Sequence, residues 1–177
     1  MRIYCAPRGG KDGSAVVYAL LRYAFQAEYG GDLPEIKKTP NGKPYFPERP
    51  DIHFSLSHAK THVLCAVSTS PVGVDIESPR TISKRAVNFF ASPEELALFD
   101  PLDLWVLKES YIKLTDSTLM SMRGKLQFTR SGGKITAPDV TVESRLYRIE
   151  GCHAAVCTLG GEPAESIDLV PGSSDNF

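Results

Sequence analysis

The chain has 177 residues, of which 42% are hydrophobic and 23% charged, and its formal net charge is −1. This length allows one substantial core or two small, closely packed lobes. The near-neutral charge, without any basic block, argues against a binder of nucleic acid or of membrane surfaces. No apolar run is long enough to cross a bilayer and no signal peptide is recognisable, so we expect a cytoplasmic protein.

The first half of the sequence predicts strands around one long helix. In chain order we expect a strand at 2–6, a glycine-rich turn at 7–12 that carries Arg8 and Lys11, a helix at 14–29, a proline-rich loop at 36–50, and strands at 53–57, 62–68 and 72–77. The helix ends at Gly30-Gly31. Short turns join the last three strands, which suggests a meander.

The second half begins with helices and continues with strands. We expect a helix at 82–91, a second after the capping box Ser92-Pro93-Glu94-Glu95, a third after Asp100-Pro101, a loop or frayed helix end at 115–122, strands at 126–130, 134–136, 140–150, 152–159 and 166–170, and a loose tail at 171–177. The class is α+β with antiparallel-rich sheets. A helix followed by strands occurs twice, which allows two similar α/β lobes, about 1–78 and 79–170, within a single domain of 1–177.

The four cysteines, Cys5, Cys65, Cys152 and Cys157, form no CxxC pair. Cys65 lies in the apolar run VLCAV, and Cys152 and Cys157 flank HAAV. Free cysteine usually behaves as a small core hydrophobe. We therefore expect buried, reduced thiols.

Two carboxylates share one face of the strand VGVDIE at 72–77. Asp75 and Glu77 are two residues apart, so their side chains point the same way. Side by side they repel each other unless a cation lies between them, and Mg²⁺ prefers oxygen ligands. Taken alone, the pair is also typical of a solvated strand end.

The helix that contains WVLKESYIK adds a third carboxylate. Residues four apart lie on one helical face, so Trp105, Glu109 and Lys113 form one stripe. A second, inward-facing stripe consists of Leu104, Leu107, Tyr111 and Leu114. A carboxylate and an ammonium in a row, opposite Asp75 and Glu77, favour a site for a metal-bound diphosphate.

Taken together, these motifs resemble one family. Gly42-Lys43-Pro44, FSLSH at 54–58, GVDIE at 73–77 and WVLKESYIK at 105–113 follow in the order and spacing of the 4′-phosphopantetheinyl transferases. The resemblance is to their single-chain, pseudo-dimeric (surfactin-synthetase-activating) type and covers roughly residues 14–170. The strand CHAAVC at 152–157 resembles the late core strand of the family.

The resemblance implies transfer of the phosphopantetheine arm of coenzyme A to a serine of an acyl or peptidyl carrier protein, with release of 3′,5′-ADP, by a monomer of the phosphopantetheinyl transferase fold. Carried over, Asp75, Glu77 and Glu109 would hold Mg²⁺. The phosphates would be held by Ser57, His58 and Lys113, with Lys60 assisting, and the adenine would be lined by Asn41, Gly42, Lys43 and Pro44 within 41–46. Glu109, acting directly or through a metal-bound water, is the preferred base for the attacking serine, and Lys113 and His58 supply positive charge.

Other positions leave questions open. Lys108 lies off the Trp105 stripe, and we expect it to meet the edge of the leaving group or a neighbouring carboxylate. The family's arginine for the 3′-phosphate aligns with Gly13, and Arg8 and Lys11 are the nearest substitutes. The sequence TDSTLM replaces the family's glycine-containing turn after Lys113.

Two alternative functions remain at this point. One is a non-catalytic module that binds coenzyme A or a carrier protein, and the other is a Mg²⁺-dependent phosphohydrolase. The sequence does not identify the carrier.

Overall fold

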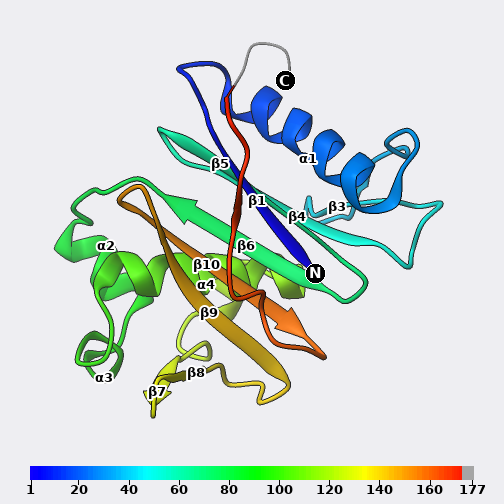
Figure 1. Cartoon of the computed structure of the whole chain (residues 1–177). Coiled ribbons are helices and arrows are strands. Elements are labelled where there is room, and N and C mark those ends of the chain that lie inside the picture. The colour runs from blue at the N-terminus through cyan, green and yellow to red at the C-terminus, as the bar shows by residue number, and fades with distance from the viewer. Residues whose placement is uncertain (173–177) are drawn as a thin grey trace.

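The computed structural model describes residues 1–172 and shows an α+β fold with two antiparallel-rich sheets (Figure 1). The first sheet has the order β11-β1-β5-β4 and contains β1 (Arg2–Pro7), β4 (His53–His58), β5 (His62–Ser68) and β11 (Asp168–Leu169). The second has the order β6-β10-β9-β8-β7 and contains β6 (Val72–Glu77), β7 (Thr129–Ser131), β8 (Lys134–Thr136), β9 (Val142–Ile149) and β10 (Cys152–Leu159). The α+β prediction is confirmed. Five residues at the end of the predicted tail lie outside the described part of the chain.

One long helix covers each sheet. The helices are α1 (Gly13–Tyr29), α2 (Lys84–Phe90), α3 (Pro93–Leu96), α4 (Pro101–Thr115) and α5 (Leu119–Met122). α1 packs its buried face, which includes Leu20, Leu21 and Phe25, onto the first sheet. α4 lies behind β6 and β10 in Figure 1 and builds the core of the second sheet.

The two predicted capping sequences start helices. The capping box of Ser92 and Glu95 opens α3, and Asp100 accepts a hydrogen bond from the amide of Leu102 at the start of α4. The predicted inward stripe of α4, Leu104, Leu107, Tyr111 and Leu114, is buried. α4 ends at Asp116, which has the left-handed φ of 51° that stops a helix.

The predicted meander is wrong in its third strand. β4 and β5 form the expected hairpin, but β6 pairs with β10 and not with β5. The chain therefore changes sheets at Pro71, and β11 later returns to the first sheet beside β1. A boundary at residue 78 consequently does not coincide with the division between the sheets.

Two serines connect the sheets. β4 and β6 are edge strands of different sheets, and no backbone ladder joins them. Instead the amides of Val74 and Ile76 donate to the hydroxyls of Ser55 (3.0 Å) and Ser57 (3.3 Å). A third apolar cluster, with members from both sheets, fills the space beside this junction.

Two segments expected to be irregular contain short elements. Within 36–50, β2 (Lys37–Lys38) and β3 (Pro44–Tyr45) form a small hairpin, and within 115–122 Thr118 caps α5. All four cysteines are buried free thiols, so their predicted burial is confirmed. No helix within residues 1–172 combines the length and apolarity needed to cross a bilayer.

Candidate active site

A pocket of ≈ 340 Å³ lies where α1, the β2–β3 hairpin, β4 and α4 meet. The predicted site residues that line it are Asn41, Gly42, Lys43, Pro44, Ser57, His58 and Lys113. Ser14, at the start of α1, also contributes, and the amide groups at a helix start favour anions. Four separate segments of the sequence thus contribute to one concave surface.

Asp75, which is 6% exposed, contacts two residues that line this pocket. Its Oδ1 atom accepts hydrogen bonds from the Ser57 hydroxyl (2.6 Å) and the Lys113 ammonium (2.7 Å). Because the Ser57 proton points at Asp75, this hydroxyl positions the carboxylate and does not donate into the pocket. Ser57 and Lys113, which both line the pocket, connect it directly to the acidic strand.

Glu77 is held by two neighbours. Arg80 donates from Nη2 to Oε1 (2.9 Å) and from Nε to Oε2 (3.2 Å), and the indole of Trp105 donates to Oε1 (3.1 Å). The two carboxylates of β6 face the Trp105 stripe, as predicted. Asp75 contacts Lys113, and Glu77 contacts Trp105. Arg80 was not predicted as a site residue. Its spacing of three residues from Glu77 was the one available signal.

Glu109 is half-buried, and its carboxylate makes no hydrogen bond or ion pair with another described residue. Burial raises the pKa of its carboxyl group, and the negative charges of Asp75 and Glu77 raise it further, while Lys113 opposes them. Repulsion of this kind shows that the three carboxylates share one electrostatic environment. An added cation would relieve it.

The three carboxylates fit Mg²⁺ by chemistry. They offer only oxygen donors, which is what a hard cation takes, and Glu109 lacks a described partner. The oxygen atoms of the three carboxylates do not, however, form a tight cluster. Among residues 1–172, Asp100, Asp103 and His153 are the three potential ligands found within 4.8 Å of one another.

The Asp100 group is explained by other contacts. Asp100 caps α4, and Asp103 accepts from Arg148 (2.7 Å) and pairs with His153 (2.8 Å). Burial opposes ionisation of Asp103, but these two partners hold the pKa of its carboxyl group below its ordinary value. The group is an ion-pair network that ties α4 to β9 and β10.

The β2–β3 hairpin is fastened to the end of α4. The Lys43 ammonium donates to the carbonyl of Leu114 (2.8 Å), and the Asn41 amide donates to the carbonyl of Asp116 (2.6 Å). The Thr39 hydroxyl also donates to the Asp116 carboxylate (3.1 Å). Burial lowers the pKa of Lys43, and Asp116 opposes that shift. Asp116, which was not predicted, therefore fixes one wall of the pocket.

His58 lies against the start of α1. A Cβ atom on Gly13 would be 2.9 Å from Cγ and Nδ1 of His58 and 3.3 Å from Nε of Arg8. Arg8 itself donates to the carbonyls of Lys11 (2.5 Å) and Ala59 (3.4 Å). Arg8 and His58 thus both border Gly13, and the absence of a side chain there leaves room for the imidazole.

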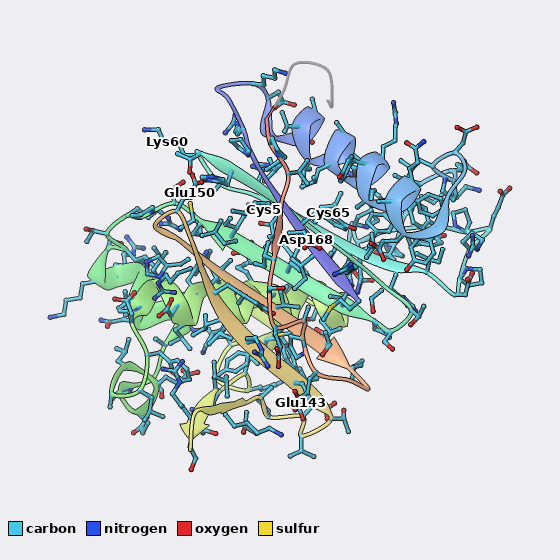
Figure 2. All side chains as sticks on the ribbon, in the orientation of Figure 1. Cys5, Lys60, Cys65, Glu143, Glu150 and Asp168 are labelled. Atoms are coloured by element: carbon cyan, nitrogen blue, oxygen red, sulfur yellow. The ribbon has the colours of Figure 1, made fainter. Side chains whose placement is uncertain are left out.

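Three predicted lysines lie elsewhere. Lys108 is buried, and its ammonium donates to the carbonyls of Phe90 and Leu126 and to the Glu95 carboxylate (2.9 Å). Its inclusion among the coenzyme A-binding residues is therefore wrong, and the neighbouring carboxylate is the expectation that the structure supports. Lys60 extends outward beyond the β4–β5 turn (Figure 2), and neither it nor Lys11 lines the pocket.

Comparison with known proteins identifies the family of the chain. Residues 71–157 match the sequence profile of the 4′-phosphopantetheinyl transferase superfamily. The 4′-phosphopantetheinyl transferase psf-1 of Bacillus pumilus is 34% identical over 174 residues, which cover 85% of this chain and 72% of the relative. The chain belongs to the 4′-phosphopantetheinyl transferase superfamily.

Other relatives match over a shorter part. The 4′-phosphopantetheinyl transferase Sfp of Bacillus subtilis (strain 168) is 34% identical over 106 residues, 53% of this chain and 47% of Sfp. The 4′-phosphopantetheinyl transferase gsp of Aneurinibacillus migulanus is 40% identical over 87 residues, 44% of this chain and 36% of gsp. The alignment with Sfp thus spans about half the length of that relative.

Proposed function

We propose that this protein transfers the 4′-phosphopantetheine group of coenzyme A to a serine of an acyl or peptidyl carrier protein and releases 3′,5′-ADP, with Mg²⁺ as cofactor. One observation carries the proposal. A partly buried group of three carboxylates and the ammonium of Lys113 adjoins a pocket lined by the family motifs. Membership of the superfamily supports the same activity.

The pocket is suited to coenzyme A. The β2–β3 hairpin, with Asn41, Gly42, Lys43 and Pro44, would contact the adenine, while His58 and Lys113 would contact the diphosphate. Ser57 would act by orienting Asp75. Arg8, beside Gly13 and His58, is the residue we propose for the 3′-phosphate, and Lys11 and Lys60 would contribute only long-range charge.

The chemistry requires charge stabilisation and a base. When bound by Asp75, Glu77 and Glu109, Mg²⁺ would act as a Lewis acid toward the diphosphate. Lys113 and His58 would donate to the oxygens on which negative charge develops. The oxygen of the carrier serine forms a bond to the phosphorus of phosphopantetheine while the bond to the leaving ADP breaks. Glu109 would accept the serine proton, directly or through a metal-bound water.

The organisation of the molecule is part of the proposal. We propose two related lobes, one built around each sheet, that meet at the β4–β6 junction and act as a monomer of the pseudo-dimeric type. The four buried free thiols support a reducing compartment, the cytoplasm.

Intact-mass analysis of apo carrier proteins tests the function. Fatty-acid, polyketide and peptide-synthesis carriers incubated with the protein, Mg²⁺ and coenzyme A should gain one phosphopantetheine each where they are accepted. Removal of Mg²⁺ by a chelator should stop the gain. Release of 3′,5′-ADP without any acceptor would indicate a hydrolase instead, and coenzyme A binding without any product would indicate a non-catalytic module.

A further inference from the structure

Arg80 makes a contact that the proposed reaction does not use. Its guanidinium binds both carboxylate oxygens of Glu77, at 2.9 and 3.2 Å, in the bidentate geometry that matches these two groups. It also lies 5.9 Å from the centre of the Trp105 ring. Trp105 in turn packs edge-on against Phe90 and donates to the same Glu77 oxygen that Arg80 Nη2 contacts.

The two strand carboxylates differ in how fully their oxygens are occupied. Both hydrogen bonds to Asp75 go to its Oδ1 atom. At Glu77 both oxygens are taken, and one of them twice. A divalent cation that approached Glu77 would meet a guanidinium already bound there, and the two positive charges would repel each other.

The position of Arg80 allows its side chain to move away from Glu77. It follows Glu77 across the turn at Ser78 and Pro79, and its side chain is 45% exposed, whereas that of Glu77 is 25% exposed. Movement of a long, half-exposed side chain into water requires no rearrangement of the core. Lys113, by contrast, projects from the last turn of α4, and its ammonium is bound to a buried carboxylate.

We infer that Arg80 is a positioning residue that holds Glu77 in the absence of metal and competes with the divalent cation for it. The inference rests on the proposed function, because it assumes that Glu77 is a metal ligand. Binding of the cation would displace Arg80 from Glu77 and disturb the hydrogen bond from Trp105. The arginine thereby weakens metal binding and keeps an uncompensated carboxylate from facing the site when no metal is bound.

Arg80 competes only weakly with the cation, because the Arg80–Glu77 ion pair is exposed. Exposed ion pairs contribute little, which corresponds to an increase in Mg²⁺ affinity on the order of two- to fivefold when the pair is removed. We therefore expect Arg80→Gln to bind Mg²⁺ more tightly by this factor. Arg80→Lys keeps the charge but not the bidentate contact, so its affinity should lie between those of the wild type and Arg80→Gln.

Trp105 provides a direct readout, because it is the only tryptophan in the chain. Mg²⁺ would be titrated into the full chain, alone and with coenzyme A, while calorimetry and tryptophan emission are recorded. Arg85→Gln is the matched control, since it removes the same charge from an exposed position five residues further along. The emission change should follow the calorimetric binding curve and shift to lower Mg²⁺ in Arg80→Gln.

The outcomes separate this inference from the proposed function. Unchanged or weaker Mg²⁺ affinity in Arg80→Gln, or an equal gain in Arg85→Gln, would overturn the competition while leaving transfer to the carrier intact. If Arg80→Gln does not fold, Arg80→Lys decides the question by the same curves. A wild type that neither binds Mg²⁺ nor modifies any carrier would overturn the function as well.

Discussion

The backbones of β6 and α4 touch at Gly73 and Ser110. A Cβ atom on Gly73 would lie 2.0 Å from the carbonyl oxygen of Ser110, a distance that no side chain tolerates. This contact fixes the position of β6 along α4, and therefore which residues of the Trp105 stripe Asp75 and Glu77 face. The position of the carboxylates therefore depends on the absence of a side chain at Gly73, two residues before Asp75.

Gly73→Ala should separate β6 from α4. Overpacking of a tight core typically destabilises by about 1–3 kcal/mol, and a backbone clash belongs at the upper end of this range. We expect a lower midpoint of urea unfolding and slower carrier modification by the protein that remains folded. Gly161→Ala is the control, because nothing lies within 4 Å of a Cβ there. Equal stability of the two variants would contradict the close contact.

Glu109→Gln should separate activity from stability. The change removes the proposed base and one metal ligand, so transfer should slow by roughly a hundredfold or more. The free energy of unfolding, by contrast, should rise. The folded-state pKa of Glu109 is raised, so ionisation of this group weakens the fold as the pH rises above the unfolded pKa and through the folded one.

The difference in stability between Glu109→Gln and the wild type should depend on pH. Glu109→Gln should unfold at a higher temperature than the wild type near neutral pH, and the difference should vanish in acid, where Glu109 is protonated in both states. Added Mg²⁺ should stabilise the wild type more than the variant. Glu165→Gln, at an exposed position away from the pocket, serves as the control. A variant that is less stable at neutral pH would count against the crowded carboxylates.

Lys108→Met should damage the fold and not the affinity for coenzyme A. It leaves the Glu95 carboxylate buried without its cation, and breaking a buried pair in this way costs about 3–5 kcal/mol. Chemical unfolding of this variant should show the loss. Replacing Glu95 by Gln as well should restore part of it, because no charge is then left alone and the side-chain oxygen can still accept from the amide of Phe128.

Calorimetry on the folded fraction of Lys108→Met checks the site. The dissociation constant for coenzyme A should match that of the wild type, because the ammonium faces Phe90, Glu95 and Leu126. Lys125→Met, at an exposed position, controls for loss of one positive charge. A large rise in the dissociation constant would return Lys108 to the binding site.

Gly13→Ala should weaken coenzyme A binding without destabilising the fold. The added methyl group meets the His58 imidazole at 2.9 Å, so the ring must move. Loss of one hydrogen bond to a charged group is worth about 1.5–3 kcal/mol, which corresponds to a roughly ten- to hundredfold rise in the dissociation constant. Alanine favours a helix more than glycine does, so the unfolding midpoint should not fall. In a His58→Ala background the same change should have little further effect on binding.

The parts of the fold that were predictable depend on short-range patterns. The caps at Ser92 and Asp100 and the buried stripe of α4 follow from residues within a few positions of one another. The partner of β6 does not, because a short buried strand carries no mark of which other strand it will pair with. Nothing in VGVDIE distinguishes β5, which precedes it, from β10, far along the chain.

The site shows the same limit. Helical spacing placed Glu109 and Lys113 on the face that meets Asp75, and this geometry is present. Spacing placed Lys108 one turn from the apolar Leu104 and Ile112, but it could not identify Glu95 as its buried partner. It also could not tell that Arg80 would fold back onto Glu77, since a flexible side chain after a turn has many possible partners.

The serine junction between β4 and β6 has a consequence for solubility. Both strands are sheet edges, and an open edge with free amide and carbonyl groups is a template for pairing with another molecule. Ser55 and Ser57 satisfy two amides of β6 and hold the two edges against each other. If the junction opened, each molecule would expose two bare edges at once. The strand that carries Asp75 and Glu77 would then be a site of aggregation as well as a failed metal site.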